Sequence, residues 1–211
     1  MISLKKLALC ALLSHAAISH AAVSVSGDVL KPVSVSFKPG MRLLDVISLA
    51  QPNPESYWLA AAWLHQPEVE KQTRLKVGVL FDLKMLQRGA LLNNNHGLAA
   101  VAARLHQYIS QLPVTGRKVV NLDPISLEVG FAHNYLVSDG DKVTYPARTN
   151  SVTVVGAVEH DCTLLYQPLQ QVRDYLDSCP RLKEAEADFL WLIHPDGTFK
   201  RVAIAAWNRE D

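Results

Sequence analysis

The sequence predicts an α+β fold built from two tandem units of the same kind. A stretch of 28 residues occurs twice without a gap, at residues 23–50 and 129 positions later at residues 152–179. In each copy, apolar residues first recur with the period of strands and then with the period of a helix. Because an internal repeat sets the architecture, we expect two units in tandem. The identical positions are Val23/Val152, Val25/Val154, Gly27/Gly156, Val29/Val158, Pro39/Pro168 and Asp45/Asp174.

Each copy has the pattern of strand, turn, strand and helix. In the first copy, apolar and small or polar residues alternate over 23–29 and again over 33–37, which is typical of half-buried strands. Residues 43–47 then carry apolar side chains at helical spacing. Gly27 and its counterpart Gly156 lie inside strands, which indicates a bulge or the close approach of another backbone.

Residues 1–21 have the features of a secretory signal peptide. Lys5 and Lys6 precede a short apolar run at 7–18, and small residues end the segment at Ala21. The apolar run is too short to span a bilayer as a mature helix; a buried N-terminal helix is the alternative. We therefore expect export to the periplasm, cleavage after about Ala21, and no membrane span in the mature protein.

The charge balance gives no support for nucleic-acid binding. The chain has 21 basic and 20 acidic residues, and removal of Lys5 and Lys6 leaves 19 basic residues and a net charge of −1. A nucleic-acid-binding protein usually carries a basic face. The part after residue 21 is long enough for one or two domains of ordinary size.

Two cysteines, Cys162 and Cys179, remain after the expected cleavage. An even number in an oxidising compartment indicates a disulfide. The repeat places Cys162 at the start of a strand and Cys179 after the helix that runs back beside this strand, so both residues should lie at the same end. Two separate buried thiols are the alternative.

Residues 54–112 predict a helical insertion within the first unit. The aromatic- and alanine-rich segment at 57–65 is interpreted as helical, and apolar residues recur at spacings of three and four over 68–88 and 98–112. A short polar link at 93–95 separates the two longer segments. Two consecutive helices with such a link are typical of an antiparallel hairpin.

Further strands are expected on either side of the second copy. Residues 118–122, 126–131 and 142–145 would complete the first sheet, and residues 188–194 and 199–206 would form the last two strands. A turn containing proline, aspartate and glycine separates this last pair. Two strands, a helix and further strands follow the order of a β-grasp domain.

Several short motifs make a family resemblance specific. They are Leu112-Pro113-Val114-Thr115-Gly116-Arg117, Val120-Asn121-Leu122-Asp123-Pro124, residues 152–158 (VTVVGAV), Asp174-Tyr175-Leu176 with Pro180-Arg181-Leu182, Ala206-Trp207-Asn208, and Tyr57-Trp58. With these motifs the chain resembles the GfcC family of periplasmic capsule-biosynthesis proteins over essentially its whole mature length.

The resemblance implies two tandem β-grasp domains, similar to the SLBB-like periplasmic domains of the polysaccharide exporter Wza. Domain 1 would span residues 22–148 and contain the helical insertion at 54–112, and domain 2 would span residues 149–211. Family members continue past the Trp-Asn element into another strand and a C-terminal helix. In the sequence up to residue 211, domain 2 is therefore truncated at its C-terminus and has no counterpart of residues 138–146. Either the protein continues beyond residue 211, or its second sheet is incomplete.

The resemblance also implies a function. We expect a non-enzymatic periplasmic accessory of capsule or exopolysaccharide assembly or export, monomeric and without a cofactor. Its partners would be an outer-membrane polysaccharide export protein, the capsular polysaccharide, or both. The alternatives are a polysaccharide-modifying enzyme, such as a glycosidase or lyase, and a small-ligand-binding β-grasp module. A glycosidase needs two placed carboxylates in a cleft, whereas the acidic residues here fall mostly in turns and on helix faces.

Arg117 is the one candidate binding residue. It matches the arginine of the family's Thr-Gly-Arg motif, at the point where the insertion rejoins the sheet. A guanidinium held there could grip a carboxylate or sugar acid through two parallel hydrogen bonds. The alternative is a structural arginine that binds backbone carbonyls at the exit of the insertion. No catalytic or metal-binding residue is expected, and Asp139-Gly140-Asp141 is interpreted as a turn rather than a calcium loop.

Overall fold

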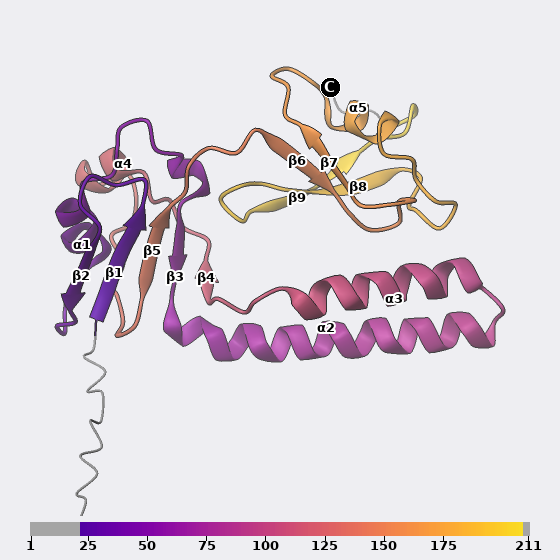
Figure 1. Cartoon of the computed structure of the whole chain (residues 1–211), viewed down its shortest axis with the longest axis horizontal. Coiled ribbons are helices and arrows are strands. Elements are labelled where there is room, and N and C mark those ends of the chain that lie inside the picture. The colour runs from indigo at the N-terminus through magenta and orange to yellow at the C-terminus, as the bar shows by residue number, and fades with distance from the viewer. Residues whose placement is uncertain (1–21, 209–211) are drawn as a thin grey trace, which may run out of the picture.

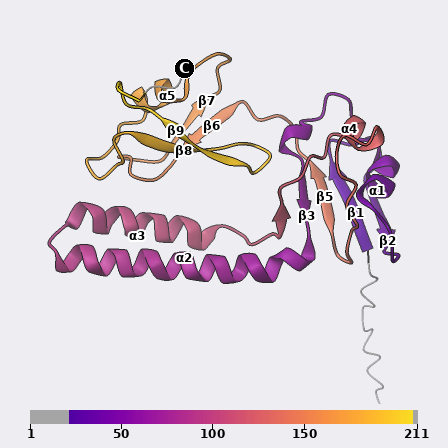
Figure 2. The same ribbon diagram turned by 180° about the vertical axis from the view of Figure 1, so that it is seen from behind.

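The protein consists of two units and a long helical hairpin (Figures 1 and 2), as seen in a computed structural model that describes residues 22–208. The expected signal peptide at 1–21 lies outside the described residues. We call residues 22–148 the first unit and residues 149–208 the second unit. Both combine strands and helices, so the α+β class predicted from the sequence is correct. No helix between residues 22 and 208 is long and apolar enough to cross a membrane.

The first unit is built on a five-stranded mixed sheet with the order β2-β1-β5-β3-β4. β1 pairs antiparallel with β2 and parallel with β5, and β5 pairs antiparallel with β3. β5, the last strand of the first unit along the chain, is therefore the central strand of the sheet. It joins the β1–β2 hairpin to the β3–β4 pair. The strands are β1 (Ala22–Gly27), β2 (Val33–Ser36), β3 (Ala62–Leu64), β4 (Arg117–Lys118) and β5 (Lys142–Tyr145).

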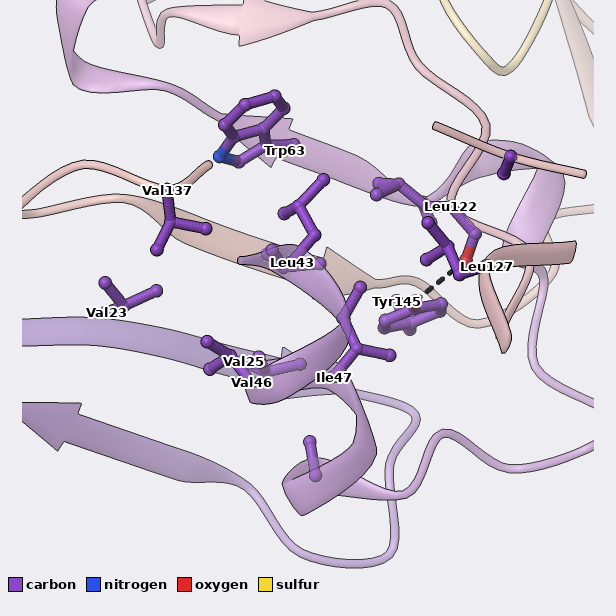
Figure 3. Close-up of a cluster of buried hydrophobic side chains, with 14 residues drawn as sticks. Val23, Val25, Leu43, Val46, Ile47, Trp63, Leu122, Leu127, Val137 and Tyr145 are labelled. Atoms are coloured by element: carbon purple, nitrogen blue, oxygen red, sulfur yellow. Dashed lines mark hydrogen bonds between the residues drawn. The ribbon is translucent and has the colours of Figure 1, made fainter. Parts of the chain in front are cut away.

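Helix α1 (Leu43–Ala50) contributes to the hydrophobic core beside the sheet. Its start is capped, because the backbone N–H of Arg42 donates to the carboxylate of Asp45 at 2.8 Å. The buried Tyr145 hydroxyl donates to the carbonyl of Leu122 at 2.8 Å, and this bond fastens the loop after β4 onto the sheet (Figure 3). Burial raises the pKa of Tyr145, and the nearby Asp123 charge acts in the same direction. Core residues labelled in the figure are Val23, Val25, Leu43, Val46, Ile47, Trp63, Leu122, Leu127, Val137 and Tyr145.

Two segments of the first unit differ from the prediction. Residues 57–65 were expected to be helical, but after a single 3₁₀ turn, η1 (Trp58–Ala60), the chain forms β3. Pairing with β4 and β5 and burial of Trp63 outweigh the helix preference of alanine here. Residues 126–131 were expected to be a strand, but helix α4 (Pro124–Glu128) forms instead. Asp123 caps it by accepting the Ser126 N–H at 3.1 Å, and proline occupies the first turn.

The insertion contains the predicted helical hairpin. Helices α2 (Gln66–Leu92) and α3 (His96–Gln111) pack side by side and project away from the first sheet (Figure 1). Pro67 lies in the first turn of α2, where the missing N–H costs nothing. At the start of α3, the side chain of Asn95 accepts the backbone N–H of Leu98 at 3.1 Å. These local signals explain why the hairpin was predictable.

The second unit contains two separate two-stranded sheets, β6–β7 and β8–β9. A disulfide joins Cys162 at the start of β7 to Cys179 just after α5, as the repeat predicted, with Cα atoms 6.1 Å apart. The alternative of two separate thiols is therefore wrong. The elements are β6 (Ser151–Val154), β7 (Cys162–Leu165), α5 (Val172–Asp177), β8 (Phe189–Ile193) and β9 (Phe199–Ala203).

The repeat seen in the sequence extends to the backbone contacts of the two units. A shift of 129 positions carries the strand pair Val25–Val33 onto Val154–Cys162. The same shift carries the isolated bridge Val29–Pro52 onto Val158–Arg181, and the helix cap at Asp45 onto the cap at Asp174. The two units therefore share the same order of strand pair, bridge and helix up to β8.

Polar contacts hold the second unit against α3. The guanidinium of Arg104 donates to the carbonyls of Gly156 at 2.6 Å, Val158 at 2.5 Å and Glu159 at 3.3 Å. The Glu184 side chain is only 8% exposed and lies over Gly97, where a Cβ would overlap its carboxylate. The two hydrophobic clusters, one in each unit, share no residue.

A buried carboxylate ties the insertion to the first sheet. Asp141, just before β5, is fully buried. Its carboxylate accepts the indole N–H of Trp63 at 2.9 Å and the backbone N–H groups of Gln66 and Ser138, both at 2.9 Å. The Nδ1 atom of His65 lies 2.8 Å from the same carboxylate. Asp141 thus has the structural role in a turn that the sequence indicated.

Replacing Asp141 tests this role. We expect Asp141→Ala to lower the free energy of unfolding by about 3 kcal/mol or more, because several buried donors lose their acceptor. Urea denaturation followed by circular dichroism measures the change. The control is Asp139→Ala in the same turn, an exposed position that should change stability by less than about 0.5 kcal/mol. Equal losses in the two variants would contradict the role of Asp141.

The disulfide gives a second prediction. Cys162 and Cys179 should resist alkylation in the oxidised protein until a reductant is added. Replacing both with serine should lower the stability of the second unit by about 3 kcal/mol, because the cross-link restricts the unfolded chain. Mass spectrometry of alkylated protein and urea denaturation provide the two measurements. Free thiols in protein purified from an oxidising compartment would contradict the pairing.

Candidate functional site at the junction of the two units

The candidate site is centred on Arg117, where the insertion returns to the first sheet. Arg117 lies in β4 and pairs with Leu64 of β3. The preceding Gly116 has φ 72°, and a Cβ there would come within 2.5 Å of the His65 carbonyl oxygen. The side chain of Gln72 holds the turn from α2: it accepts the N–H of Gly116 at 3.0 Å and donates to the Arg117 carbonyl at 2.9 Å. The position of Arg117 is therefore fixed by the backbone on both sides.

The guanidinium of Arg117 bridges the two units. Its Nη2 donates to the carbonyl of Pro195 at 2.5 Å and to the carbonyls of Ala61 at 3.3 Å and Ala60 at 3.5 Å. These contacts match the alternative role considered from the sequence, an arginine that binds carbonyls at the exit of the insertion. Its Nε is buried and has no hydrogen-bond partner among the described residues.

The electrostatics of the junction couple Arg117 to the hairpin turn of the second unit. Burial lowers the pKa of Arg117, and the charge of Asp196 opposes this effect. Partial burial acts to raise the pKa of Asp196, but hydrogen bonds from Thr198 and the nearby His194 and Arg117 hold it below its usual value. The charges of Arg117 and Asp196 thus favour each other's ionised form, and the hydrogen bond from Arg117 to the Pro195 carbonyl holds the β8–β9 turn against β4.

An exposed apolar groove begins beside Arg117. It has a volume of about 390 Å³ and is lined by Trp191, Ile193, Gly197 and Phe199 of the β8–β9 hairpin. The three large side chains are 65%, 73% and 68% exposed, so they form an apolar patch on the surface. A Cβ at Gly197 would lie 3.8 Å from the Nε of Arg117, which places one end of the groove at the candidate arginine.

The same face of the hairpin carries a cation. Arg201 pairs across the hairpin with Trp191, so their side chains project from the same face. The Arg201 guanidinium lies 3.6 Å from the ring centroid of Phe189, and the rings of Trp191 and Phe199 meet edge-to-face at 5.7 Å. Exposed aromatic rings beside a guanidinium suit a ligand with flat apolar faces and acidic groups.

A second set of aromatic residues near Arg117 supports the sheet. The ammonium group of Lys118 lies 5.1 Å from the ring centroid of Trp63 and 4.6 Å from that of Tyr135. Trp63 is 1% exposed and its indole N–H is bound by Asp141. This cluster is closed to a ligand such as a sugar ring, in contrast to the groove on the hairpin.

The sequence pointed to Arg117 but not to the groove beside it. Trp191 and Ile193 are separated by two positions, so the alternation within β8 places them on one face. That signal predicts which residues share a face, but not that this face is exposed. At the other end of the hairpin, the side chains of Trp207 and Asn208 donate hydrogen bonds to Asp188 at 3.1 Å and 3.2 Å. These bonds hold the last described residues against the start of β8.

Between residues 22 and 208, no group of three or more His, Cys, Asp or Glu side chains is arranged to hold a metal ion. A polar hollow of about 530 Å³ lies at the turn between α2 and α3 and is lined by Asn93–Gly97, Lys183 and Glu184. It belongs to the contact that seats the second unit on α3.

Comparison with known proteins places the chain in a family. The family model for the N-terminal part of the capsule-biosynthesis protein GfcC matches residues 19–145, and the model for the GfcC C-terminal part matches residues 161–211. The Escherichia coli K12 protein named "Uncharacterized protein YjbG" is 25% identical over 167 residues. That alignment covers 79% of this chain but 66% of YjbG, so the chain spans slightly less than two thirds of this relative. The chain belongs to the GfcC family of capsule-biosynthesis proteins.

Proposed function

We propose that this protein is a non-enzymatic accessory of capsule or exopolysaccharide assembly or export that works in the periplasm. Its family supports a role in capsule biosynthesis. The signal peptide expected at residues 1–21 and the disulfide between Cys162 and Cys179 support an oxidising, extracytoplasmic compartment. The expected partners are the capsular polysaccharide and an outer-membrane polysaccharide export protein.

We also assign both units to the β-grasp fold, the SLBB-like arrangement expected from the sequence. In the first unit, support comes from the parallel pairing of the first and last strands and from the helix that connects the hairpin to the rest of the sheet. In the second unit, support comes from the repeated contacts at an interval of 129 residues. The helical hairpin is an insertion between two neighbouring strands of the first unit.

The groove on the β8–β9 hairpin is the observation that carries the binding proposal. A large exposed apolar patch on a protein surface usually marks an interaction site. Trp191 and Phe199 offer ring faces for a pyranose, and Arg201 offers a cation for its carboxylate. The groove meets Arg117 at Gly197, so a glycan chain lying in the groove would reach the junction of the two units. We infer that the ligand is an acidic polysaccharide, bound without turnover.

Arg117→Ala tests whether the junction takes part in binding. Loss of the carbonyl contacts should lower the free energy of unfolding by about 1–2 kcal/mol. Binding of the polysaccharide purified from the same cells should weaken by about tenfold or more, because the hairpin that carries the groove is no longer held against β4. Urea denaturation and isothermal titration calorimetry give the two values. Unchanged binding by the folded variant would remove Arg117 from the site.

Two further variants distinguish binding in the groove from a non-specific attraction between charges. Trp191→Ala removes an exposed ring, so it should weaken binding while leaving stability within about 0.5 kcal/mol. Arg74→Ala removes an exposed arginine of α2 that is paired with Glu70 and should leave both quantities unchanged. If Arg117→Ala and Arg74→Ala weaken binding equally and Trp191→Ala does not weaken it, the interaction is a non-specific attraction between charges.

The cellular role gives a fourth prediction. Cells that lack this protein should display less surface polysaccharide while they continue to synthesise the polymer in the cytoplasm, because an accessory of assembly or export acts after synthesis. Staining of intact cells measures the surface polymer, and chemical assay of cell extracts measures the total. A normal amount of surface polysaccharide in the deleted strain would contradict the proposed role.

A further inference from the structure

Helix α2 has apolar side chains on two sides, and only one of these sides is covered. The covered side faces α3: Ala90 is buried, and the ammonium group of Lys76 donates to the carbonyls of Ser110 and Leu112 at the end of α3, at 2.9 Å and 2.5 Å. A helix that packs on one side normally presents polar residues to water on the other. Seven apolar side chains of α2 are nevertheless exposed: Leu75, Val77, Phe81, Met85, Leu86, Leu91 and Leu92.

Four of these apolar residues form one stripe together with two arginines. Six residues of α2 follow one another at intervals of three or four and therefore lie along one face of the helix: Arg74, Val77, Phe81, Met85, Arg88 and Leu92. We call these six residues the outer stripe. Phe81 at its centre is 63% exposed, and Arg74 and Arg88 each lie seven residues from it, which is nearly two helical turns. The stripe thus has an apolar centre with a cation on either side.

The outer stripe points away from α3. Because successive residues of a helix are about 100° apart, Lys76, which faces α3, lies about 140° around α2 from Phe81. Figures 1 and 2 show α3 between α2 and the second unit, so α2 is the outermost element of this part of the molecule. The last described residues, Trp207 and Asn208, are bonded to Asp188 in the second unit, across α3 from the stripe. No part of the described chain covers this face of α2.

The exposed side of α2 has an excess of positive charge. Helix α2 contains five basic and three acidic residues. Arg74 is paired with Glu70 at 2.5 Å, whereas Arg88 forms no salt bridge within residues 22–208. Asp82 lies about 100° around the helix from Phe81 and is therefore off the stripe. The charge of the stripe is thus complementary to an anionic surface.

A second copy of this chain does not match the outer stripe. In a parallel pair of α2 helices, each arginine of the stripe would face the same arginine of the other copy. In an antiparallel pair centred on Phe81, Arg74 would face Arg88, because both lie seven residues from the centre. Like charges placed opposite each other at an interface are unfavourable. A surface with anionic groups above an apolar layer instead suits both the arginines and the apolar residues between them.

We propose that α2 lies on the surface of an anionic phospholipid bilayer and binds it through the outer stripe. Val77, Phe81 and Met85 enter the boundary between headgroups and acyl chains, as the apolar face of an interfacial helix does. The long side chains of Arg74 and Arg88 reach the lipid phosphates. With 27 residues, α2 is about 40 Å long, and its whole length can lie in the plane of the membrane. This proposal is independent of the binding of polysaccharide on the β8–β9 hairpin.

Flotation of the mature full chain with lipid vesicles tests the proposal. The probe is a vesicle of phosphatidylethanolamine that contains phosphatidylglycerol as the anionic lipid, and the control is a vesicle of phosphatidylcholine alone. Binding to the anionic vesicle should be at least about tenfold tighter than to the neutral vesicle. It should weaken when the salt concentration is raised from about 0.1 M to about 1 M, because salt screens the arginines. No binding to the anionic vesicle, or equal binding to both vesicles, would overturn the proposal.

Matched pairs of variants locate the contact. Phe81→Ser should weaken binding to the anionic vesicle by at least about tenfold. Phe131→Ser should leave binding unchanged, because Phe131 is 90% exposed but lies just after α4 in the first unit. Arg88→Gln should also weaken binding, whereas Lys200→Gln, at an exposed position of β9, should not. Circular dichroism checks that each variant is folded, and equal effects within either pair of folded variants would overturn the assignment to the outer stripe.

A fluorescence measurement detects the contact through a gain of signal. In vesicles whose phosphatidylglycerol carries brominated acyl chains, Phe81→Trp should show quenching beyond that of the unaltered chain, because the new ring lies among the acyl chains. This measurement decides the matter if Phe81→Ser does not fold. The absence of additional quenching would overturn the proposal.

Sedimentation of the chain without vesicles identifies a competing occupant. A monomer at all concentrations supports binding of the stripe to lipid. Self-association that Phe81→Ser abolishes and Phe131→Ser preserves would show that a second copy covers the outer stripe, and would overturn the assignment to a membrane surface.

Discussion

The carboxylate of Asp141 joins three parts of the chain at one buried point. It binds the side chain of Trp63 in β3, the first backbone N–H of α2 and the turn that leads into β5. A buried charge is stable only when hydrogen bonds replace its hydration, so the geometry around it is narrowly defined. The long hairpin leaves the sheet at this point, and Arg117 lies where it returns. The position of the candidate site therefore depends on the carboxylate.

The same carboxylate positions β5, the central strand of the first sheet. With this strand in place, the first unit closes one sheet over one core. Residues 149–208 contain no counterpart of β5, and this part of the second unit has two short sheets, a smaller core around its disulfide, and exposed aromatic side chains on β8 and β9. The cross-link and the polar contacts of Arg104 and Arg117 compensate for the small core. A small domain commonly depends on such additional restraints.

The sequence predicts most strongly what is local or repeated. The 129-residue shift placed Cys162 and Cys179 at one end of an adjacent strand and helix, and spacing predicted the α2–α3 hairpin. The prediction was wrong for residues 57–65 and 126–131. In the first segment, long-range strand pairing outweighs the local apolar pattern. In the second, a capped helix start that contains proline outweighs it. The donors of Asp141 include residues 75 or more positions away, and no local pattern reports such contacts. No local pattern reports which face of β8 the rest of the chain covers, so the exposure of Trp191 was also beyond prediction.

The central claim is that one strand position is filled in the first unit and is left open by residues 149–208 of the second. Native-state hydrogen exchange of the full chain tests it directly, because it compares equivalent amides in one molecule. The amides of Ser24 and Asp28, which donate to residues 141 and 145, should exchange only through large-scale unfolding of the first unit. The equivalent amides of Thr153 and Ala157 should exchange about 100-fold or more faster. Similar protection of the two pairs in the isolated chain would mean that a strand already occupies the second position, and would contradict this account.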